Sequence, residues 1–191
     1  MEVLGISGSL RRDSHNTNLL RAAAELVDGE TAFELWEGLK AVPPYDADDD
    51  VAEAPAAVAE LRAAIAGADA VLFATPEYNS SIPGQLKNAL DWVSRPLATN
   101  PLRNKPVAVV GASTGAFGAV WSQAELRKVL AAIGARVLDC EVACRHADAR
   151  FDENGRLVDE EARMQLEEAV ERLVEAARAR VENALTATVA A

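Results

Sequence analysis

The chain has 191 residues, of which half are hydrophobic and about a quarter are charged, and its formal net charge is −11. The negative charge argues against non-specific binding of nucleic acid or of an anionic membrane surface, because both are polyanions. No apolar run approaches the length of a bilayer span, so no membrane insertion is expected. Met1 leads almost directly into a predicted strand, without a basic flank and an apolar leader, which favours a cytoplasmic protein.

Short apolar runs alternate along the chain with longer segments of helical periodicity. The runs expected to form strands are residues 2–7, 33–36, 70–74, 106–110 and 137–143. The segments expected to form helices are residues 16–27, 55–66, 83–93, 118–133 and 159–181. The stretch with two prolines and an acidic run at residues 43–50 is expected to be a solvated connection.

Continuously apolar strands separated by helices indicate a parallel sheet that is covered on both faces. Five such strands predict an α/β, three-layer, doubly wound domain of the flavodoxin-like type, with a five-stranded parallel sheet in the order 2-1-3-4-5. We expect residues 1–182 to form this single domain. Residues 183–191 are expected to be a frayed tail of mainly small residues.

Polar loops follow the first, third and fourth predicted strands, and in this topology those loops meet at one edge of the sheet. The first loop, residues 8–18, offers hydroxyls, an amide and arginines beside a predicted helix start. Helix N-termini bind phosphate because their first amides lack partners. The loop matches neither G-x-x-x-x-G-K-[ST] nor G-x-G-x-x-G, which favours a terminal monophosphate. The alternative is that Ser14 or Asn16 only caps the helix.

The other two loops are also rich in backbone groups and small residues. Residues 75–92 follow a predicted buried strand. Pro76 ends the strand, and a helix is expected to begin near Pro83. Residues 111–118 contain glycines that let a flat ligand approach the backbone, although Gly115 and Gly118 could instead be turn residues only.

Cysteine and histidine usage gives no sign of a metal or redox centre. Cys140 and Cys144 are four residues apart, which is neither a zinc nor a redox spacing, so both are expected to be free thiols. His15 and His146 are too few and too far apart to predict a metal site.

In these three loops the chain resembles the NADPH-dependent FMN reductase family of flavodoxin-like proteins, which includes quinone, azo-dye and chromate reductases. Residues 8–16 (GSLRRDSHN) are similar to the family's GSLR-x-x-S-x-N phosphate loop. Residues 76–92 (PEYNSSIPGQLKNALDW) are similar to its PEYN-x-S-x-PG-x-LKN-x-x-DW segment. Residues 111–134 resemble its third loop and the Q-x-x-LR helix that follows.

The resemblance implies bound FMN, with NADPH or NADH as the electron donor and a quinone, azo compound or similar small molecule as the acceptor. The residues implied to hold the FMN phosphate are Ser9, Arg11, Ser14, His15, Asn16 and Thr17. Those implied to lie along the flavin ring are Pro76, Glu77, Tyr78 and Asn79 on one side and Ser113, Thr114 and Gly115 on the other. Because the flavin carries the chemistry, no catalytic side chain is predicted.

The resemblance also implies a homodimer or homotetramer that is built through the helix of residues 85–95. Trp92 could serve either the interface or the core, and the polar residues of this helix are Lys87, Asn88, Asp91 and Arg95.

Two other functions share the same fold. An FMN-binding electron carrier or redox-sensing protein would not turn over pyridine nucleotides, and the acidic composition would suit a basic redox partner. A scaffold without flavin would not need the phosphate loop. The 76–92 segment resembles the reductases, so we expect an enzyme.

Overall fold

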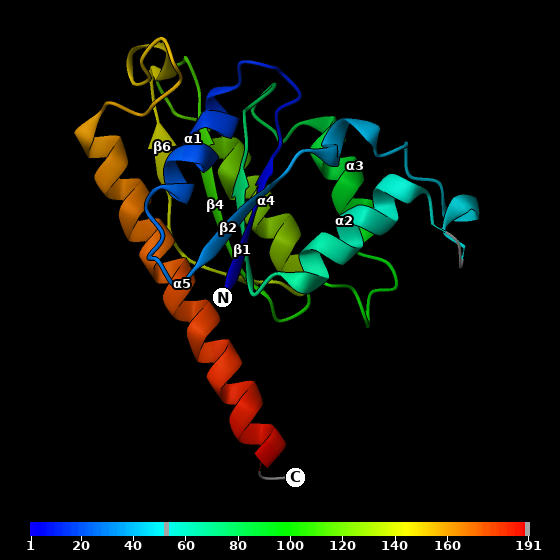
Figure 1. Cartoon of the computed structure of the whole chain (residues 1–191). Coiled ribbons are helices and arrows are strands. Elements are labelled where there is room, and N and C mark those ends of the chain that lie inside the picture. Colours follow the sequence, from blue (N-terminus) through cyan, green and yellow to red (C-terminus); the bar gives the residue numbers. More distant parts are fainter. Residues whose placement is uncertain (52–53, 190–191) are drawn as a thin grey trace.

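The computed structural model describes the backbone of residues 1–51 and 54–189 (Figure 1). A parallel sheet lies at its centre in the order β2-β1-β3-β4-β5, and a sixth strand, β6, also pairs with β4. The strands are β1 (Glu2–Ser7), β2 (Ala32–Trp36), β3 (Ala70–Ala74), β4 (Pro106–Ala112), β5 (Arg136–Val137) and β6 (Val142–Cys144). The predicted strand order and flavodoxin-like class are confirmed.

Helices cover both faces of the sheet and complete three layers (Figure 1). One face is covered by α1 (His15–Ala24) and α5 (Glu160–Val189). The other face is covered by α2 (Ala56–Gly67), α3 (Gly84–Val93) and α4 (Val120–Ala132). The connections contain the short 3₁₀ helices η1 (Gly38–Ala41), η2 (Ala47–Asp49) and η3 (Ala147–Ala149).

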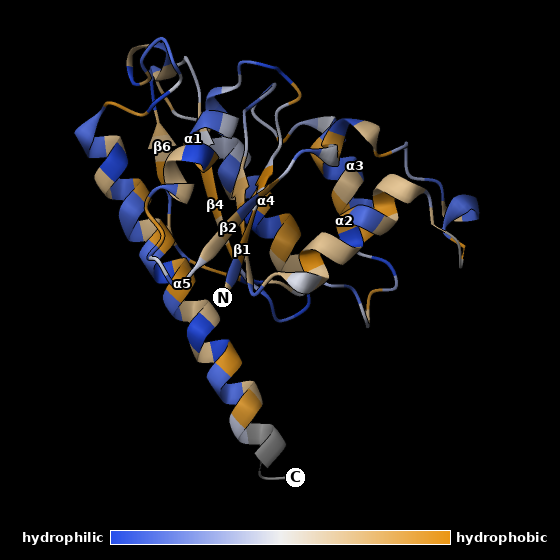
Figure 2. Cartoon of the chain, viewed as in Figure 1, coloured by the Kyte–Doolittle hydropathy of each residue, from blue (hydrophilic) through white to orange (hydrophobic). Residues whose placement is uncertain are grey.

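Strand β3 illustrates why the apolar runs are continuous. Leu72 and Ala74 belong to the core under α1 and α5, while Val71 and Phe73 belong to the core under α2, α3 and α4. Successive side chains of a strand point to opposite faces, so a strand covered on both faces must be apolar at every position. The helices need only one apolar stripe, and Figure 2 shows hydrophobic and hydrophilic residues alternating along α5.

The predicted strand at residues 137–143 is wrong as a single element. Val107 and Val110 of β4 are three positions apart, but their partners Val137 and Val142 are five positions apart, so the chain bulges between β5 and β6. Within the bulge, the Cys140 carbonyl accepts a hydrogen bond from Arg127 Nη1 of α4 at 3.3 Å. A side chain thus replaces the strand partner. Cys140 and Cys144 are free thiols, as predicted, and burial raises the pKa of Cys144 to about 11.

Two helix boundaries differ from the predictions. Helix α4 begins at Val120 rather than at residue 118, because Gly118 and Ala119 have φ values of 60° and 61° and cannot join a right-handed helix. Helix α1 ends at Ala24 rather than near residue 27.

The last helix was predicted to end near residue 181, but α5 continues to Val189. Its core contacts stop at Ala177, and beyond that point α5 projects past the sheet (Figure 1). The projecting part has Leu185 63% exposed, so an apolar periodicity toward the core could not reveal it. Residues 183–189 of the predicted tail are therefore helical, and residues 190–191 lie outside the described part of the chain. In that described part, no helix is both long and apolar enough to cross a bilayer.

Trp92 belongs to the core and not to an exposed face of α3. It is fully buried, its Nε1 donates to the Pro43 carbonyl at 2.9 Å, and its ring meets Tyr45 edge-on at 4.9 Å. Asn88 binds the same connection, donating to the Pro43 carbonyl and accepting from the Tyr45 N–H, both at 2.7 Å. The connection predicted as solvated is thus packed against α3 over its first residues.

Lys105 is a buried lysine, 2% exposed, whose Nζ donates to the carbonyls of Ala66 and Ala68 at the end of α2. Burial lowers the pKa of Lys105 from 10.5 to about 8. Between these two values the unfolded chain binds this proton and the folded chain does not, so stability should rise with pH there. Relative to a Lys105→Met variant, we expect the native free energy of unfolding to increase by about 1 kcal/mol from pH 7 to pH 9.5 in urea titrations. A constant difference across that interval would contradict a desolvated ammonium.

Candidate functional site

The loops after β1, β3 and β4 meet at the carboxyl edge of the sheet and enclose one pocket. The residues that line it are Ser9, Arg11, Ser14, His15, Asn16, Pro76, Glu77, Tyr78, Ala112, Ser113 and Thr114. All the predicted cofactor-binding residues are among them except Thr17, Asn79 and Gly115. Ala112, the last residue of β4, is the lining residue that sequence reasoning missed.

The first loop runs into α1, and Ser14 caps that helix. The backbone of Ser14 is extended, and its Oγ accepts a hydrogen bond from the Thr17 N–H at 3.3 Å. The capping role of Ser14 is thus confirmed, and its hydroxyl can still donate to a ligand in the pocket. Nδ1 of His15 is buried without a hydrogen-bond partner among the described residues, while the ring stacks on Phe151 at 5.3 Å.

Thr17 supports the loop instead of lining the pocket. Its Oγ1 donates to Ser7 Oγ at 2.9 Å, and the same Ser7 oxygen accepts from the Ser9 N–H at 3.3 Å. The Arg11 N–H in turn approaches Ser9 Oγ at 3.4 Å. These short-range bonds hold the backbone of the loop in place while the Arg11 side chain stays exposed.

The side chain of Asn16 joins two distant parts of the site. Its Nδ2 donates to the Ala112 carbonyl and its Oδ1 accepts from the Ala112 N–H, both at 2.9 Å, across 96 positions of sequence. Asn16 is 4% exposed, and these two bonds engage one hydrogen of its amide nitrogen and one lone pair of its amide oxygen. The groups of Asn16 that remain for a ligand are the backbone N–H at the start of α1 and the second hydrogen of Nδ2.

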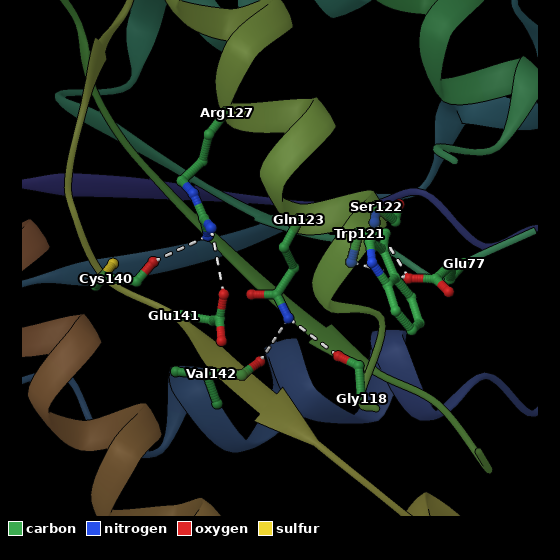
Figure 3. A network of polar contacts seen from close by, with 9 residues as sticks. All are labelled: Glu77, Gly118, Trp121, Ser122, Gln123, Arg127, Cys140, Glu141 and Val142. Atoms are coloured by element: carbon green, nitrogen blue, oxygen red, sulfur yellow. Dashed lines mark hydrogen bonds and ion pairs between the residues drawn. The ribbon is translucent and has the colours of Figure 1, made fainter. Parts of the chain in front are cut away.

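The second loop is anchored to α4. Thr75 Oγ1 and Ser122 Oγ lie 2.9 Å apart, and each also lies 2.9 Å from the Pro76 carbonyl oxygen. Each hydroxyl can donate its one hydrogen either to that carbonyl or to the other hydroxyl. The Glu77 carboxylate accepts from the N–H groups of Trp121 and Ser122 at 3.1 and 3.2 Å (Figure 3). A carboxylate at a helix N-terminus is favoured by the unpaired amides and the helix dipole. Glu77 therefore lines the pocket, while its carboxylate caps the N-terminus of α4.

A tight turn follows at Tyr78. The N–H and carbonyl groups of Tyr78 and Ser81 are hydrogen-bonded to each other at 3.1 Å, and the two residues between them, Asn79 and Ser80, have φ values of 53° and 59°. Positive φ at both central positions is typical of a type I′ turn, for which asparagine is favoured. This explains why Asn79 forms the turn and does not line the pocket. Tyr78 stays 51% exposed at the rim.

The third loop is held against β6 and the residues after it. The Ser113 N–H donates to the Cys144 carbonyl at 3.0 Å, and the Ala147 N–H donates to the Ser113 carbonyl at 3.0 Å. Gly118 closes the loop against Ala143, where a Cβ on Gly118 would lie 2.6 Å from the Ala143 carbonyl carbon. The Gly115 carbonyl accepts a hydrogen bond from the His146 N–H at 3.1 Å, so the backbone of Gly115 helps to hold the third loop in place.

The Q-x-x-LR residues of α4 fix β6 beside this loop (Figure 3). Gln123 Nε2 donates to the carbonyls of Gly118 and Val142 at 3.0 and 3.1 Å. Arg127 donates to the Cys140 carbonyl and pairs with Glu141, both at 3.3 Å. The resemblance had pointed to this helix, but only the structure shows that its polar side chains position the third loop.

A doubly wound parallel sheet whose switch point combines a helix N-terminus, an arginine and two loops of small residues defines a flavodoxin-like protein with a site for a phosphorylated, flat ligand. The sequence pattern of the NADPH-dependent FMN reductase family matches residues 1–149. The chain belongs to this family. It is an FMN-dependent NAD(P)H oxidoreductase, and this membership favours the enzyme over the electron carrier.

Individual relatives agree with this assignment. An NAD(P)H-dependent FMN reductase of Pseudomonas aeruginosa is 44% identical over 160 residues, or 83% of this chain and 85% of that protein. A 2-hydroxy-1,4-benzoquinone reductase of a Burkholderia species is 38% identical over 159 residues, or 83% and 86%. The solved flavoenzyme NAD(P)H:(acceptor) oxidoreductase FerB of Paracoccus denitrificans has a TM-score of 0.80 and 34% identity, covering 93% of this chain and 97% of FerB.

The residues of the pocket fit FMN. The unpartnered Nδ1 of His15, the Ser9 and Ser14 hydroxyls and the exposed Arg11 guanidinium form a donor set for a phosphate monoester. Pro76 and Ala112 line the same pocket, where their apolar atoms suit a flat ring.

Proposed function

We propose that this protein transfers a hydride from NADPH or NADH to FMN bound in the pocket, and then passes electrons to a quinone, an azo compound or a similar small acceptor. The observation that carries the proposal is that the phosphate-loop residues and the ring-side residues line one pocket, although they come from three loops far apart in sequence. The benzoquinone reductase among the relatives supports a quinone as the acceptor.

The FMN phosphate would be held by Arg11, the hydroxyls of Ser9 and Ser14, and the backbone N–H groups that begin α1. The ring would lie between the segment from Pro76 to Tyr78 and the segment of Ser113 and Thr114. The chemistry that bound FMN would supply is acceptance of the hydride from the nicotinamide and transfer of electrons to the acceptor. The protein orients the FMN, and no side chain of the pocket is needed as an acid or a base.

The hydrogen bonds of the two ring-side loops support this division of labour. The Pro76 carbonyl is fixed by the hydroxyls of Thr75 and Ser122, and the Glu77 carboxylate is engaged by α4. The backbone that would face the ring is therefore rigid before any ligand binds, which lowers the entropy lost on binding.

We extend the proposal to the whole chain in three respects. Residues 1–182 would form one FMN-binding domain. The protein would be a homodimer or homotetramer in which α3 contributes its exposed face, where Lys87 and Asp91 form an ion pair at 2.7 Å. Buried Trp92 would not take part in this contact. Use of NAD(P)H is consistent with a cytoplasmic location.

The direct test begins with the visible spectrum of the purified protein, followed by anaerobic titration with NADPH and with NADH. Bleaching of the flavin band by either donor and its return with a benzoquinone are expected. A protein that binds FMN but is not reduced by either donor would instead be an electron carrier or a redox sensor.

Substitution of Arg11 tests the phosphate site. We expect Arg11→Ala to raise the Kd for FMN by about tenfold or more, since a charge-assisted hydrogen bond to phosphate is lost. Affinity for riboflavin, which has no phosphate, should be unchanged in the same flavin-fluorescence titrations. Equal losses for both flavins would place Arg11 away from the phosphate. Arg136→Ala, an exposed arginine in β5 at the opposite edge of the sheet, is the control.

A further inference from the structure

A groove lies between the residues that follow α1 and the middle of α5, away from the flavin pocket. Buried Val174 and half-buried Val27 give it an apolar floor, whereas Glu175 and Arg178 are exposed at its edge. Arg178 forms an ion pair with Asp28, which also lines the groove. We call this feature the α1–α5 groove.

The end of α5 projects past the sheet and carries apolar side chains that the rest of the chain does not bury. Beyond Ala177 the helix makes no further core contact, Val181 is half-buried and Leu185 is 63% exposed. Figures 1 and 2 show this end extending from the body of the protein with hydrophobic residues along it. The matched family pattern stops at residue 149, so this surface lies outside the part of the chain that the pattern covers.

The groove and the projecting end share one face of α5. Val174, Arg178, Val181 and Leu185 follow one another at intervals of four, three and four residues. This spacing places side chains on one stripe of a helix and is typical of a seam between two helices. The face that lines the groove therefore continues directly into the exposed Leu185.

We propose that a second copy of this chain docks here, with the projecting end of each α5 lying antiparallel in the α1–α5 groove of the other copy. The groove and the exposed end belong to one straight helix, so the end cannot return to its own groove (Figure 1). Two such faces related by a two-fold axis complement each other. The surface is separate from the exposed face of α3, and the inference does not depend on the proposed reaction.

The spacing along α5 sets the register of the pair. Leu185 follows Val174 by 11 positions, which is about 16 Å along a helix. A two-fold axis midway between them places Leu185 of each copy against Val174 of the other. The same register places Val181 against the aliphatic stem of Arg178, so the seam is filled by apolar atoms at each level.

The charges beside the seam are compatible with this register. Arg178 of each copy then lies between Glu175 of its own helix and Glu182 of the second copy. The guanidinium offsets the repulsion between these two carboxylates, and it can keep its ion pair with Asp28.

The first test compares molecular masses by sedimentation equilibrium of the FMN-loaded protein. Leu185→Lys should halve the mass, because it places an ammonium group in the apolar groove. Met164→Lys is the matched control, since Met164 lies on the same helix and is also 63% exposed. Both side chains are exposed, so the fold should be unchanged. A monomeric native protein, or equal masses of the two variants, would overturn the inference.

The second test locates the contact by cross-linking between copies. Oxidation of an equimolar mixture of Val27→Cys and Leu185→Cys variants should give a disulfide-linked dimer on a non-reducing gel. Leu185→Cys alone should not, because the two-fold axis keeps the two residues 185 about 16 Å apart, beyond the reach of a disulfide. The native protein, treated in the same way, controls for Cys140 and Cys144. A dimer of Leu185→Cys alone would indicate parallel ends and overturn the inference, as would a mixture that forms no link.

Discussion

Replacing Asn16 by alanine is expected to lower the free energy of unfolding by about 2–4 kcal/mol, because the Ala112 N–H and carbonyl would both lose their partner in a buried site. FMN affinity should fall as well, since Asn16 holds the start of α1 against the end of β4. Urea unfolding and flavin-fluorescence titration measure the two effects. Asn18→Ala on the same helix is the control, as the hydrogen bond that it removes, to Arg21, is exposed.

An Asn16→Asp variant makes the test sharper. A carboxylate can accept from the Ala112 N–H, but its second oxygen would face the Ala112 carbonyl, so the ionised form is disfavoured and the folded-state pKa should rise. The variant should then be less destabilised at pH 5, where the protonated acid can donate, than at pH 7. If Asn16→Asp is as stable as the native protein at pH 7, the reciprocal bond to Ala112 does not exist.

Replacing Gly118 by alanine is expected to destabilise the protein by about 3 kcal/mol or more. The φ of 60° disfavours any L side chain, and the new Cβ would overlap the backbone of Ala143. Relief requires the third loop to move away from β6, which breaks the bonds from Gln123 to Gly118 and Val142. FMN affinity should therefore fall together with stability.

The same loop offers a matched control in Gly115, where a Cβ would lie 3.4 Å from Ser113 Oγ and no positive φ is required. We expect Gly115→Ala to change the free energy of unfolding by about 0.5 kcal/mol or less. Hydrogen exchange of the backbone amides in β6 should increase in the Gly118 variant only. Similar stability of the two variants would show that the approach of Gly118 to Ala143 is not tight.

The phosphate loop shows how far sequence reasoning reached. The loop and its helix start were predicted, and a cap at Ser14 or Asn16 was the stated alternative, since a cap depends on residues within one helical turn. The hydrogen bonds from Asn16 to the backbone of Ala112 were not predicted, because Ala112 lies 96 positions away and no local pattern indicates it. The alternatives of capping and ligand binding proved compatible for Ser14, whose oxygen accepts from the helix while its hydrogen remains available.

For the last predicted strand, sequence reasoning failed. The apolar run at residues 137–143 predicted one strand, but β4 pairs with two short ones. The break is decided by Arg127 of α4, which takes the Cys140 carbonyl, and by the approach of Gly118 to Ala143. Both contacts come from elements outside the run, so its hydropathy could not show where pairing would stop.

The sequence by itself determined the first four strands, the strand order, the three polar loops and the family, because apolar runs, helix starts and motif spacing are local properties. Only the tertiary structure decided which polar groups of those loops remain for a ligand. Asn16 and Glu77 have side chains that the protein itself engages, whereas Arg11 and the Ser14 hydroxyl face the pocket. The physical reason is that most buried polar groups find a partner within the protein, and the partner is chosen by the fold as a whole.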